Sequence, residues 1–354
     1  MDHLALYRKY RPDSFENVLG QEHIVKVLAN SVETGNVSHA YLFIGSRGTG
    51  KTSLARIFAA GLGTSQSDLY EIDAASNRGI EDIRELRDGV RVLPFDSKYK
   101  IYIIDEVHML SRDAWGALLK TLEEPPKHVI FILATTELHK VPDTIVSRCQ
   151  TFVFKKPTDM ILKNHLNAVS LKEGYTLEEG GAELIAILGD GSFRDALGVL
   201  DKVLNFAKKE NQKASKQSLK ITLEEIESVT GSPKRNVVNG ILSALGEGDL
   251  EAGLNVLRLA VSENLDMDLL LKLILQKFRI AVILKYAPSQ AENMRGDLRD
   301  EDLEFLKDLV KNDKGAVFRS KGLINLLEAY ANINNAFIPS LPLEIALIDI
   351  LNKE

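Results

Sequence analysis

The chain has 354 residues, which is too long for one ordinary hydrophobic core and predicts two or three domains. Its net charge of −6, from 44 basic and 50 acidic residues, argues against a protein that coats nucleic acid, because uniform phosphate binding needs surplus positive charge. The single cysteine, Cys149, excludes a disulfide framework within the chain and a multi-cysteine zinc site, and it fits a reducing cytosol.

The chain shows no membrane or export signal. Residues 1–13 carry charges where a signal peptide needs an apolar core. No apolar run reaches the roughly 20 residues that span a bilayer. The longest candidate, 269–284, contains four polar or charged residues and predicts an amphipathic helix in a packed bundle. We therefore expect a cytoplasmic protein that has no membrane partner.

Residues 1–155 alternate between short apolar runs and stretches with helical spacing. The apolar runs, typical of buried parallel strands, are 41–45, 101–105, 129–136 and 151–154. The helical stretches between them are 52–62, 80–90 and 111–124. Ser111 is the expected N-cap of the last helix and Pro125 its stop. This alternation predicts a three-layer α/β domain.

From about residue 158 onward the strand pattern disappears and helical periodicity continues. We expect only helices here, with a small bundle over 159–221 and a larger one over 222–354. The polar run 208–220 is the candidate linker between them. A helical hairpin is expected over 245–261, turning at Gly246 to Gly248.

A phosphate-binding motif lies between the first strand and the first of these helices. It has the form G-x-x-x-x-G-K-[ST] and consists of Gly45, Ser46, Arg47, Gly48, Thr49, Gly50, Lys51 and Thr52. The glycines let backbone N–H groups surround phosphates, Lys51 reaches the β- and γ-phosphates, and Thr52 offers a hydroxyl to Mg²⁺. The alternative is an ordinary glycine-rich turn, which the complete motif between a strand and a helix disfavours.

Polar residues end two later strands. Asp105 is placed to hold Mg²⁺ through water, and Glu106 to polarise the attacking water. Thr135 or Thr136 could contact the γ-phosphate from the end of the strand at 129–136. Each of these residues is also ordinary at a strand end, so the roles depend on the phosphate motif.

Seven stretches carry a family resemblance: LYRKYRPDSFENVLGQEHI, HAYLFIGSRGTGKTSLAR, EIDAASNRGIEDIREL, YIIDEVHMLS, ALLKTLEEPPKHVIFILATTE, PDTIVSRCQTF and GSFRDAL. Together they resemble the AAA+ clamp-loader ATPases, and among these the bacterial gamma/tau motor subunits of DNA polymerase III. The resemblance is dense over residues 4–200. It implies a P-loop AAA+ domain over 1–158, a helical lid domain over 159–221 and an all-α oligomerising collar over 222–354.

The resemblance also implies roles for three further residues. Thr136 matches the first phosphate sensor, with Thr135 as the neighbouring possibility, and Arg194 matches the second sensor. Without the resemblance, Arg194 would be taken as a solvated or paired surface residue. Arg148 of the SRC sequence matches an arginine finger that reaches the nucleotide site of the next subunit, where it stabilises charge on the transferred phosphoryl group. Cys149 is then a packing residue.

The expected cofactors are ATP and Mg²⁺. The resemblance implies an adenine-binding segment near the amino end, consisting of Tyr7, Arg8, Tyr10, Arg11, Pro12, Val18 and Leu19. Members of the family commonly insert a four-cysteine zinc module where this chain has only residues 61–68, so no zinc is predicted.

The implied partners are the delta and delta-prime subunits, further gamma/tau copies, a sliding clamp, and primer-template DNA bound without sequence specificity. Met109 and Leu110 are candidate clamp contacts, with a core role as the alternative. Candidate DNA contacts at one helix start and its surroundings are Asn77, Arg78, Gly79, Arg84, Arg87, Arg91, Lys98 and Lys100. A solvated helix with paired charges is an equal alternative for this stretch.

These features predict the ATP-dependent motor subunit of a clamp loader, which opens a sliding clamp and loads it onto primer-template DNA during replication. One alternative is another AAA+ DNA-processing ATPase, although the sequence shows no pore loop or winged-helix domain. The other is a non-hydrolysing clamp-loader subunit, against which the intact phosphate motif and the Asp105–Glu106 pair speak.

Overall fold

The structure is a computed structural model and describes residues 4–76, 86–214, 220–291, 300–314 and 316–352. The chain forms two compact units, residues 1–162 with 189–198, and residues 163–188 with 199–354. The three-domain division with boundaries after residues 158 and 221 stays a prediction. Among the described residues, no helix is both long and apolar enough to cross a membrane.

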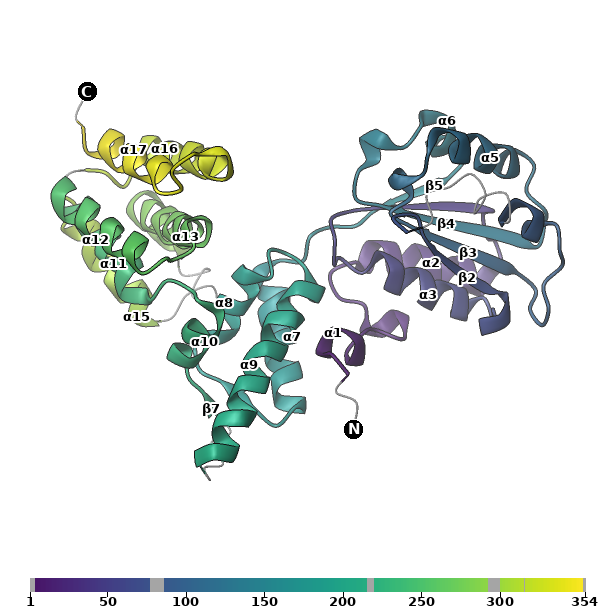
Figure 1. The fold of residues 1–354 in the computed structure, drawn as a ribbon, viewed down its shortest axis with the longest axis horizontal. Helices are drawn as coiled ribbons and strands as arrows, with labels where there is room; N and C mark the ends of the chain where they lie inside the picture. Colours follow the sequence, from purple (N-terminus) through teal and green to yellow (C-terminus); the bar gives the residue numbers. More distant parts are fainter. Residues whose placement is uncertain (1–3, 77–85, 215–219, 292–299, 315, 353–354) are drawn as a thin grey trace. The chain divides into compact units, whose positions relative to one another are not determined.

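A five-stranded parallel sheet forms the centre of the first unit (Figure 1). The strands, in spatial order, are β2 (Leu69–Asp73), β3 (Lys100–Asp105), β4 (Val129–Thr135), β1 (Ala40–Ile44) and β5 (Gln150–Val153). The four strands expected from apolar runs are confirmed to within one residue at each end. All residues of β1 and β4 are buried, as in a parallel sheet covered on both faces.

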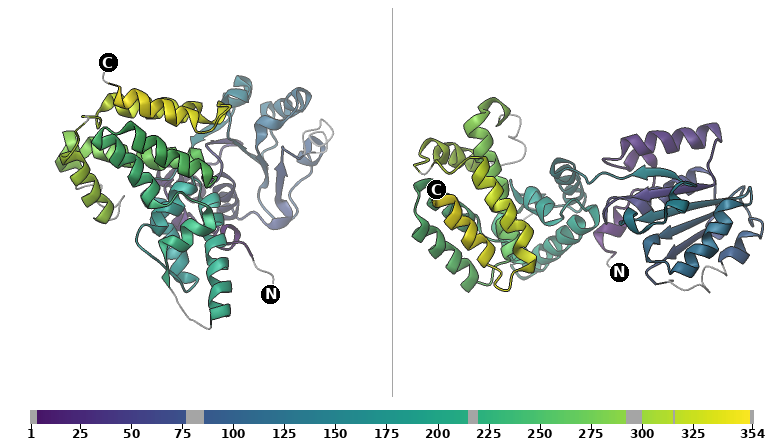
Figure 2. Two further views of the ribbon diagram at one scale, coloured as in Figure 1. Left: turned by 60° about the vertical axis from the view of Figure 1, so that its left-hand side comes forward. Right: turned by 90° about the horizontal axis from the view of Figure 1, so that it is seen from above.

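Helices cover both faces of this sheet. The helical segments of the first unit are α1 (Leu6–Lys9), η1 (Phe15–Asn17), α2 (Glu22–Thr34), α3 (Lys51–Gly61), η2 (Gln66–Asp68), η3 (Val107–Met109), α5 (Arg112–Glu123), η4 (Leu138–Lys140) and α6 (Asp143–Val146). Figure 1 shows α2 and α3 on one side of the strands and α5 and α6 on the other, and the right-hand view of Figure 2 shows α2 along one face from above.

Alternation along β1 supplies both layers of the core. Phe43 packs with Leu54 and Phe58 of α3 on one face, while Leu42 packs with Trp115 of α5 on the other. This arrangement confirms the expected three-layer α/β domain.

The local signals for α5 are also confirmed. Ser111 caps the helix, since its Oγ accepts a hydrogen bond from the Ala114 backbone N–H at 3.2 Å. The expected helix over 80–90 falls mostly outside the described residues, and its described part, residues 86–90, is helical.

The second unit is largely helical, with one correction. The helical segments that lie wholly or mainly in it are α7 (Asp159–Lys172), α8 (Gly181–Leu188), α9 (Phe193–Ala214), α10 (Leu223–Thr230), α11 (Arg235–Glu247), α12 (Leu250–Ser262), α13 (Met267–Tyr286), α14 (Pro288–Ala291), α15 (Asp300–Lys311), α16 (Ser320–Asn332), η6 (Ile333–Asn335) and α17 (Leu341–Leu351). The expectation of helices alone was wrong, because β6 (Thr176–Leu177) and β7 (Lys220–Ile221) form a small parallel pair.

The predicted linker over 208–220 was wrong in its first half. Helix α9 continues through Ala214, because its apolar stripe and good helix formers extend the helix into the polar run. The hairpin expected at 245–261 is present as α11 and α12, but the left-handed residue is Gly248. Gly246 is still helical, and a Cβ there would lie 2.7 Å from the Leu309 side chain.

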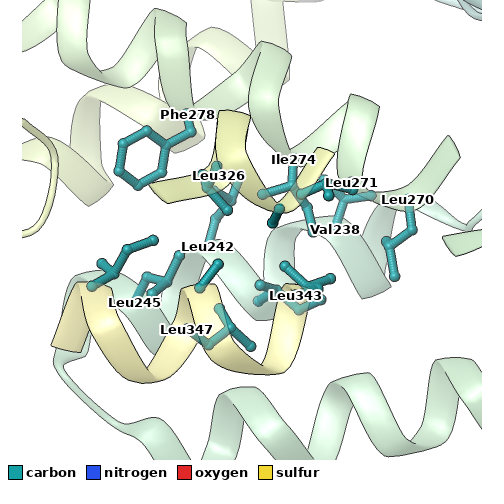
Figure 3. Close-up of a cluster of buried hydrophobic side chains, with 14 of the residues drawn as sticks. Val238, Leu242, Leu245, Leu270, Leu271, Ile274, Phe278, Leu326, Leu343 and Leu347 are labelled. Atoms are coloured by element: carbon teal, nitrogen blue, oxygen red, sulfur yellow. The ribbon is translucent and has the colours of Figure 1, made fainter. Parts of the chain in front are cut away.

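A hydrophobic core cluster of the second unit joins α11, α13, α16 and α17 (Figure 3). Leu242, Ile274, Phe278 and Leu326 are all fully buried in this cluster. The long amphipathic segment at 269–284 is therefore a core helix, as expected.

A buried carboxylate holds the entry to β3. Asp68 accepts hydrogen bonds from the backbone N–H groups of Phe95 at 2.6 Å, Asp96 at 2.9 Å and Ser97 at 2.8 Å. Burial alone would raise the pKa of Asp68, but these hydrogen bonds outweigh it and hold the pKa well below its usual range. Asp68 thereby fixes the loop that leads into the strand ending at Asp105.

We expect Asp68→Asn to lower the free energy of unfolding at pH 7 by about 2 kcal/mol, because it removes charge-assisted hydrogen bonds. The ionised Asp68 has a lower pKa in the folded than in the unfolded protein. Its full contribution to stability is therefore present at pH values above the unfolded pKa of about 3.9, and it is lost as the pH falls below that value. Chemical denaturation between pH 3 and 7 measures both effects. Asp96→Asn removes a neighbouring exposed carboxylate and serves as the control. Equal acid sensitivity of the wild type and Asp68→Asn would contradict this account.

Candidate functional site

The phosphate motif connects the end of β1 to the start of α3. Lys51 Nζ donates to the carbonyl oxygens of Gly45 at 2.8 Å and Ser46 at 3.0 Å. Burial lowers the pKa of Lys51, Arg194 adds to this, and Glu106 and Asp105 oppose it. The Ser46 hydroxyl is buried and has no hydrogen-bond partner in the described part of the chain. The Lys51 ammonium, bonded to carbonyls of its own loop, and this Ser46 hydroxyl are donors that a bound phosphate group could accept from.

Gly48 brings a distant segment to this loop. It has φ +73°, and a Cβ on it would lie 1.9 Å from Ser192 Oγ. The Gly48 carbonyl also accepts a hydrogen bond from Phe193 N at 3.1 Å. These contacts place the start of α9 against the loop, and they explain why Arg194 influences the pKa of Lys51. The motif pattern leaves residue 48 unrestricted, so this requirement could not be predicted from it.

Thr52 and Asp105 lie together, as expected for a shared metal ion. Thr52 Oγ1 donates to Asp105 Oδ2 at 2.6 Å, and Asp105 Oδ1 accepts from Glu106 N at 3.0 Å. A hydroxyl and a carboxylate are the hard oxygen ligands that Mg²⁺ prefers, so the residues fit this ion.

The structure distinguishes the two threonines at the end of β4. Thr136 Oγ1 donates to Glu106 Oε2 at 3.0 Å. Thr135 is fully buried, where its Oγ1 contacts His108 Nδ1 at 3.0 Å and accepts from Glu137 N at 3.0 Å. Thr136 is therefore the threonine directed at the carboxylate of Glu106, whose backbone adopts a left-handed φ of 48°.

Sequence reasoning missed His108 and Glu137. The buried His108 side chain lies with Nδ1 3.5 Å from Glu106 Oε2 and Nε2 3.2 Å from Glu137 Oε1. A hydrogen bond from Lys140 is the main cause that lowers the pKa of Glu137. A histidine two residues after Glu106 was a visible signal, but only the fold brings it to Glu137.

The amino-terminal segment reaches the phosphate loop through one arginine. Arg11 Nε donates to Ser53 Oγ at 2.9 Å, one residue after the motif ends. Val18 packs on the core beside α3, whereas Leu19 is exposed. Arg8 lies over the ring of Tyr7, and Lys9 over the ring of Tyr10. The adenine-binding role of this segment, Pro12 included, stays a prediction.

Arg148 contacts helices of its own chain on the side of the sheet that α5 covers. It follows α6 in a tight turn, where its N–H donates to Ile145 O at 3.0 Å, and its guanidinium pairs with Glu123 of α5 at 2.8 Å. Cys149 is half-buried against the core cluster of α5 and α6. Burial raises the pKa of Cys149 to about 11, so the thiol is protonated at neutral pH.

The candidate DNA and clamp contacts have mixed outcomes. Asn77, Arg78, Gly79 and Arg84 lie outside the described residues. Arg87 pairs with Asp88, and Arg91 and Lys98 are exposed. Lys100 was a wrong candidate, because it is buried and donates to Gly89 O at 2.8 Å. Leu110 is buried in the core and Met109 packs partly against it.

Comparisons of the sequence find relatives among DNA polymerase III subunits. A family model described as DNA polymerase III, delta subunit, matches residues 20–71 and 63–158. The tau subunit of Bacillus subtilis is 42% identical over 81% of this chain and 53% of that protein. The gamma subunit of Buchnera aphidicola subsp. Baizongia pistaciae is 34% identical over 98% of this chain and 93% of that protein. The chain spans about half the length of the Bacillus subtilis and Mycoplasma genitalium relatives.

A comparison of folds finds the RuvB Holliday junction branch migration motor of Thermotoga maritima. The TM-score is 0.52 at 22% sequence identity, over 73% of this chain and 86% of that chain. The likeness shows a shared fold, an α/β domain with a helical region.

Gly48→Ala should weaken nucleotide binding, because the added Cβ collides with Ser192 and disfavours the left-handed backbone. We expect the free energy of unfolding to fall by about 1–3 kcal/mol. The rise in Tm on adding ATP should largely disappear, as measured by calorimetry.

Gly35→Ala is the matched control, since Gly35 has φ +68° but nothing within 4 Å of its Cβ position. It should retain the full ATP-induced rise in Tm. A Gly48→Ala protein that also retains it would show that the contact with Ser192 is dispensable for the loop.

Proposed function

The chain belongs to the gamma/tau family of DNA polymerase III subunits, and we propose that it is an ATP-dependent motor subunit of the replicative clamp loader. In this role it opens a sliding clamp and loads it onto primer-template DNA, together with delta and delta-prime subunits and further copies of itself. The observation that carries the proposal is the convergence of Lys51, Thr52, Glu106 and Thr136 at one edge of the sheet. A non-hydrolysing subunit would not need this complete set.

The residues at this edge divide the chemistry among them. Lys51 exchanges its contacts with two loop carbonyls for the phosphates of ATP, and the loop N–H groups surround them. Mg²⁺, held by Thr52 and Asp105, would neutralise phosphate charge. Glu106 orients the attacking water, and Thr136 holds the Glu106 carboxylate in place.

Arg148 completes the site of a neighbouring subunit in this proposal. Within its own chain the guanidinium contacts α5 and α6, whereas Lys51 and Arg194 serve the phosphate loop. An arginine supplied by a second subunit stabilises the charge that develops on the transferred phosphoryl group, an effect of about 10³ to 10⁵ in rate in known cases. ATP turnover would then depend on assembly.

Turnover of ATP by the full chain, assembled with delta and delta-prime subunits, tests the proposal. We expect the rate to rise when sliding clamp and primer-template DNA are both added. Arg148→Ala should leave ATP affinity unchanged but lower turnover in the assembly by at least about 10²-fold. A turnover rate that does not change when the clamp is added would favour another DNA-processing ATPase. A protein that does not bind ATP would favour a non-hydrolysing subunit.

Self-association is supported by apolar side chains on the second unit. They come from α16, from α17 and from the turn between these neighbouring helices (Figure 1). The exposed residues of this collar patch are Ile324, Leu327, Phe337, Ile338, Leu341 and Ile345. Phe337 is fully exposed, and exposed apolar side chains that gather on two packed helices and the turn between them are typical of an interaction site.

Phe337→Asp combined with Ile345→Asp should abolish self-association without unfolding the chain, because both side chains are exposed. Sedimentation velocity measures the oligomeric state, and circular dichroism confirms the fold. Leu259→Asp, at an exposed position on α12, is the control and should leave the oligomer intact. Unchanged association of the double variant would exclude the collar patch as the contact surface.

A further inference from the structure

The Arg148 guanidinium is held at two points by separate helices. Its Nη2 donates to Glu123 Oε1 at 2.8 Å, and its Nη1 donates to the Thr144 carbonyl oxygen at 2.7 Å. A longer contact of 3.5 Å joins Nη1 to Ser147 Oγ. Glu123 is the last residue of α5, and Thr144 lies in α6. The plane of the guanidinium is therefore defined within the single chain.

This arrangement leaves Arg148 able to bind a further ligand. A guanidinium carries five N–H donors in a planar fork, and the contacts named above involve only Nη1 and Nη2. The Arg148 side chain is 35% exposed and the Glu123 side chain 45%. The ion pair thus orients an accessible arginine and does not bury it.

We propose that Glu123 is a positioning residue for Arg148 during ATP hydrolysis in the neighbouring subunit, an inference that rests on the proposed action of Arg148 in trans. An arginine finger must occupy one geometry when phosphoryl charge develops, and a long free side chain loses rotamer freedom to reach it. Glu123 and the Thr144 carbonyl remove much of that freedom beforehand. Thr144 restrains one terminal nitrogen, and Glu123 restrains the other.

The opposite effect is physically conceivable and makes the inference testable. A carboxylate also competes with phosphate for the guanidinium, so a competing Glu123 would slow hydrolysis, and its removal would raise the rate. Positioning requires that removal lowers the rate. Because the pair is partly exposed, we expect a loss of about two- to fivefold.

Mixed assemblies of full-length chains, with delta and delta-prime subunits, separate these outcomes. A donor chain carries Lys51→Ala, so it keeps Arg148 but cannot turn over its own ATP. An acceptor chain carries Arg148→Ala and keeps its phosphate loop. Glu123→Ala in the donor should lower kcat about two- to fivefold, with KM for ATP unchanged, because the acceptor's loop binds ATP.

Three comparisons make the result specific to positioning. Glu123→Gln in the donor keeps an oxygen acceptor and should lose less activity than Glu123→Ala. Glu123→Ala in the acceptor should leave kcat unchanged, since the acceptor chain has no Arg148 guanidinium to orient. Glu124→Ala in the donor removes the adjacent exposed carboxylate and should leave the rate unchanged.

The positioning role is overturned if the assembly that contains the Glu123→Ala donor turns over ATP at an unchanged or higher rate. It is equally overturned if Glu123→Ala lowers kcat by the same factor in the donor and in the acceptor, which would indicate a general packing role at the end of α5. A mixture that is inactive with Glu123 intact would refute the action of Arg148 in trans, and with it the role of Glu123.

Discussion

The candidate site depends on one property of a parallel sheet, namely that the carboxyl ends of its strands meet at the same edge. The phosphate loop follows β1, Asp105 and Glu106 follow β3, and the threonine pair ends β4. These segments are far apart in sequence, yet β3 and β1 both pair with β4. Backbone hydrogen bonds therefore set the spacing of the reacting groups, and the apolar layers on both faces hold that spacing rigid.

Basic side chains gather at this edge of the sheet, although the chain as a whole is acidic. The protein is acidic overall, but Arg194 is near enough to lower the pKa of both Arg11 and Lys51, for which burial is the largest cause of the shift. Such a cluster of positive charge is stable only where an anion or a carboxylate compensates for it. Asp105 and Glu106 supply part of that compensation. Net charge therefore says little about what binds at this edge.

Local patterns in the sequence predicted the strands, the phosphate motif and the capped helix at 112–123, because burial, glycine spacing and capping act over a few residues. Contacts between segments distant in sequence could not be predicted from these local patterns. The approach of Ser192 to Gly48, the pairing of His108 with Glu137 and the ion pair of Arg148 with Glu123 all depend on the tertiary fold. Lys100 was misassigned for the same reason, since a lysine at a strand start looks solvated until Gly89 is placed beside it.

The contact of Gly48 with Ser192 has a mechanical consequence. Helix α9, which begins directly after Ser192, is continuous from Phe193 to Ala214 and about 33 Å long at 1.5 Å per residue. Its first residue also donates a backbone hydrogen bond to the Gly48 carbonyl at 3.1 Å, so the helix start cannot be displaced without disturbing the loop. The phosphate loop and the start of α9 are therefore coupled through the contact between Gly48 and Ser192.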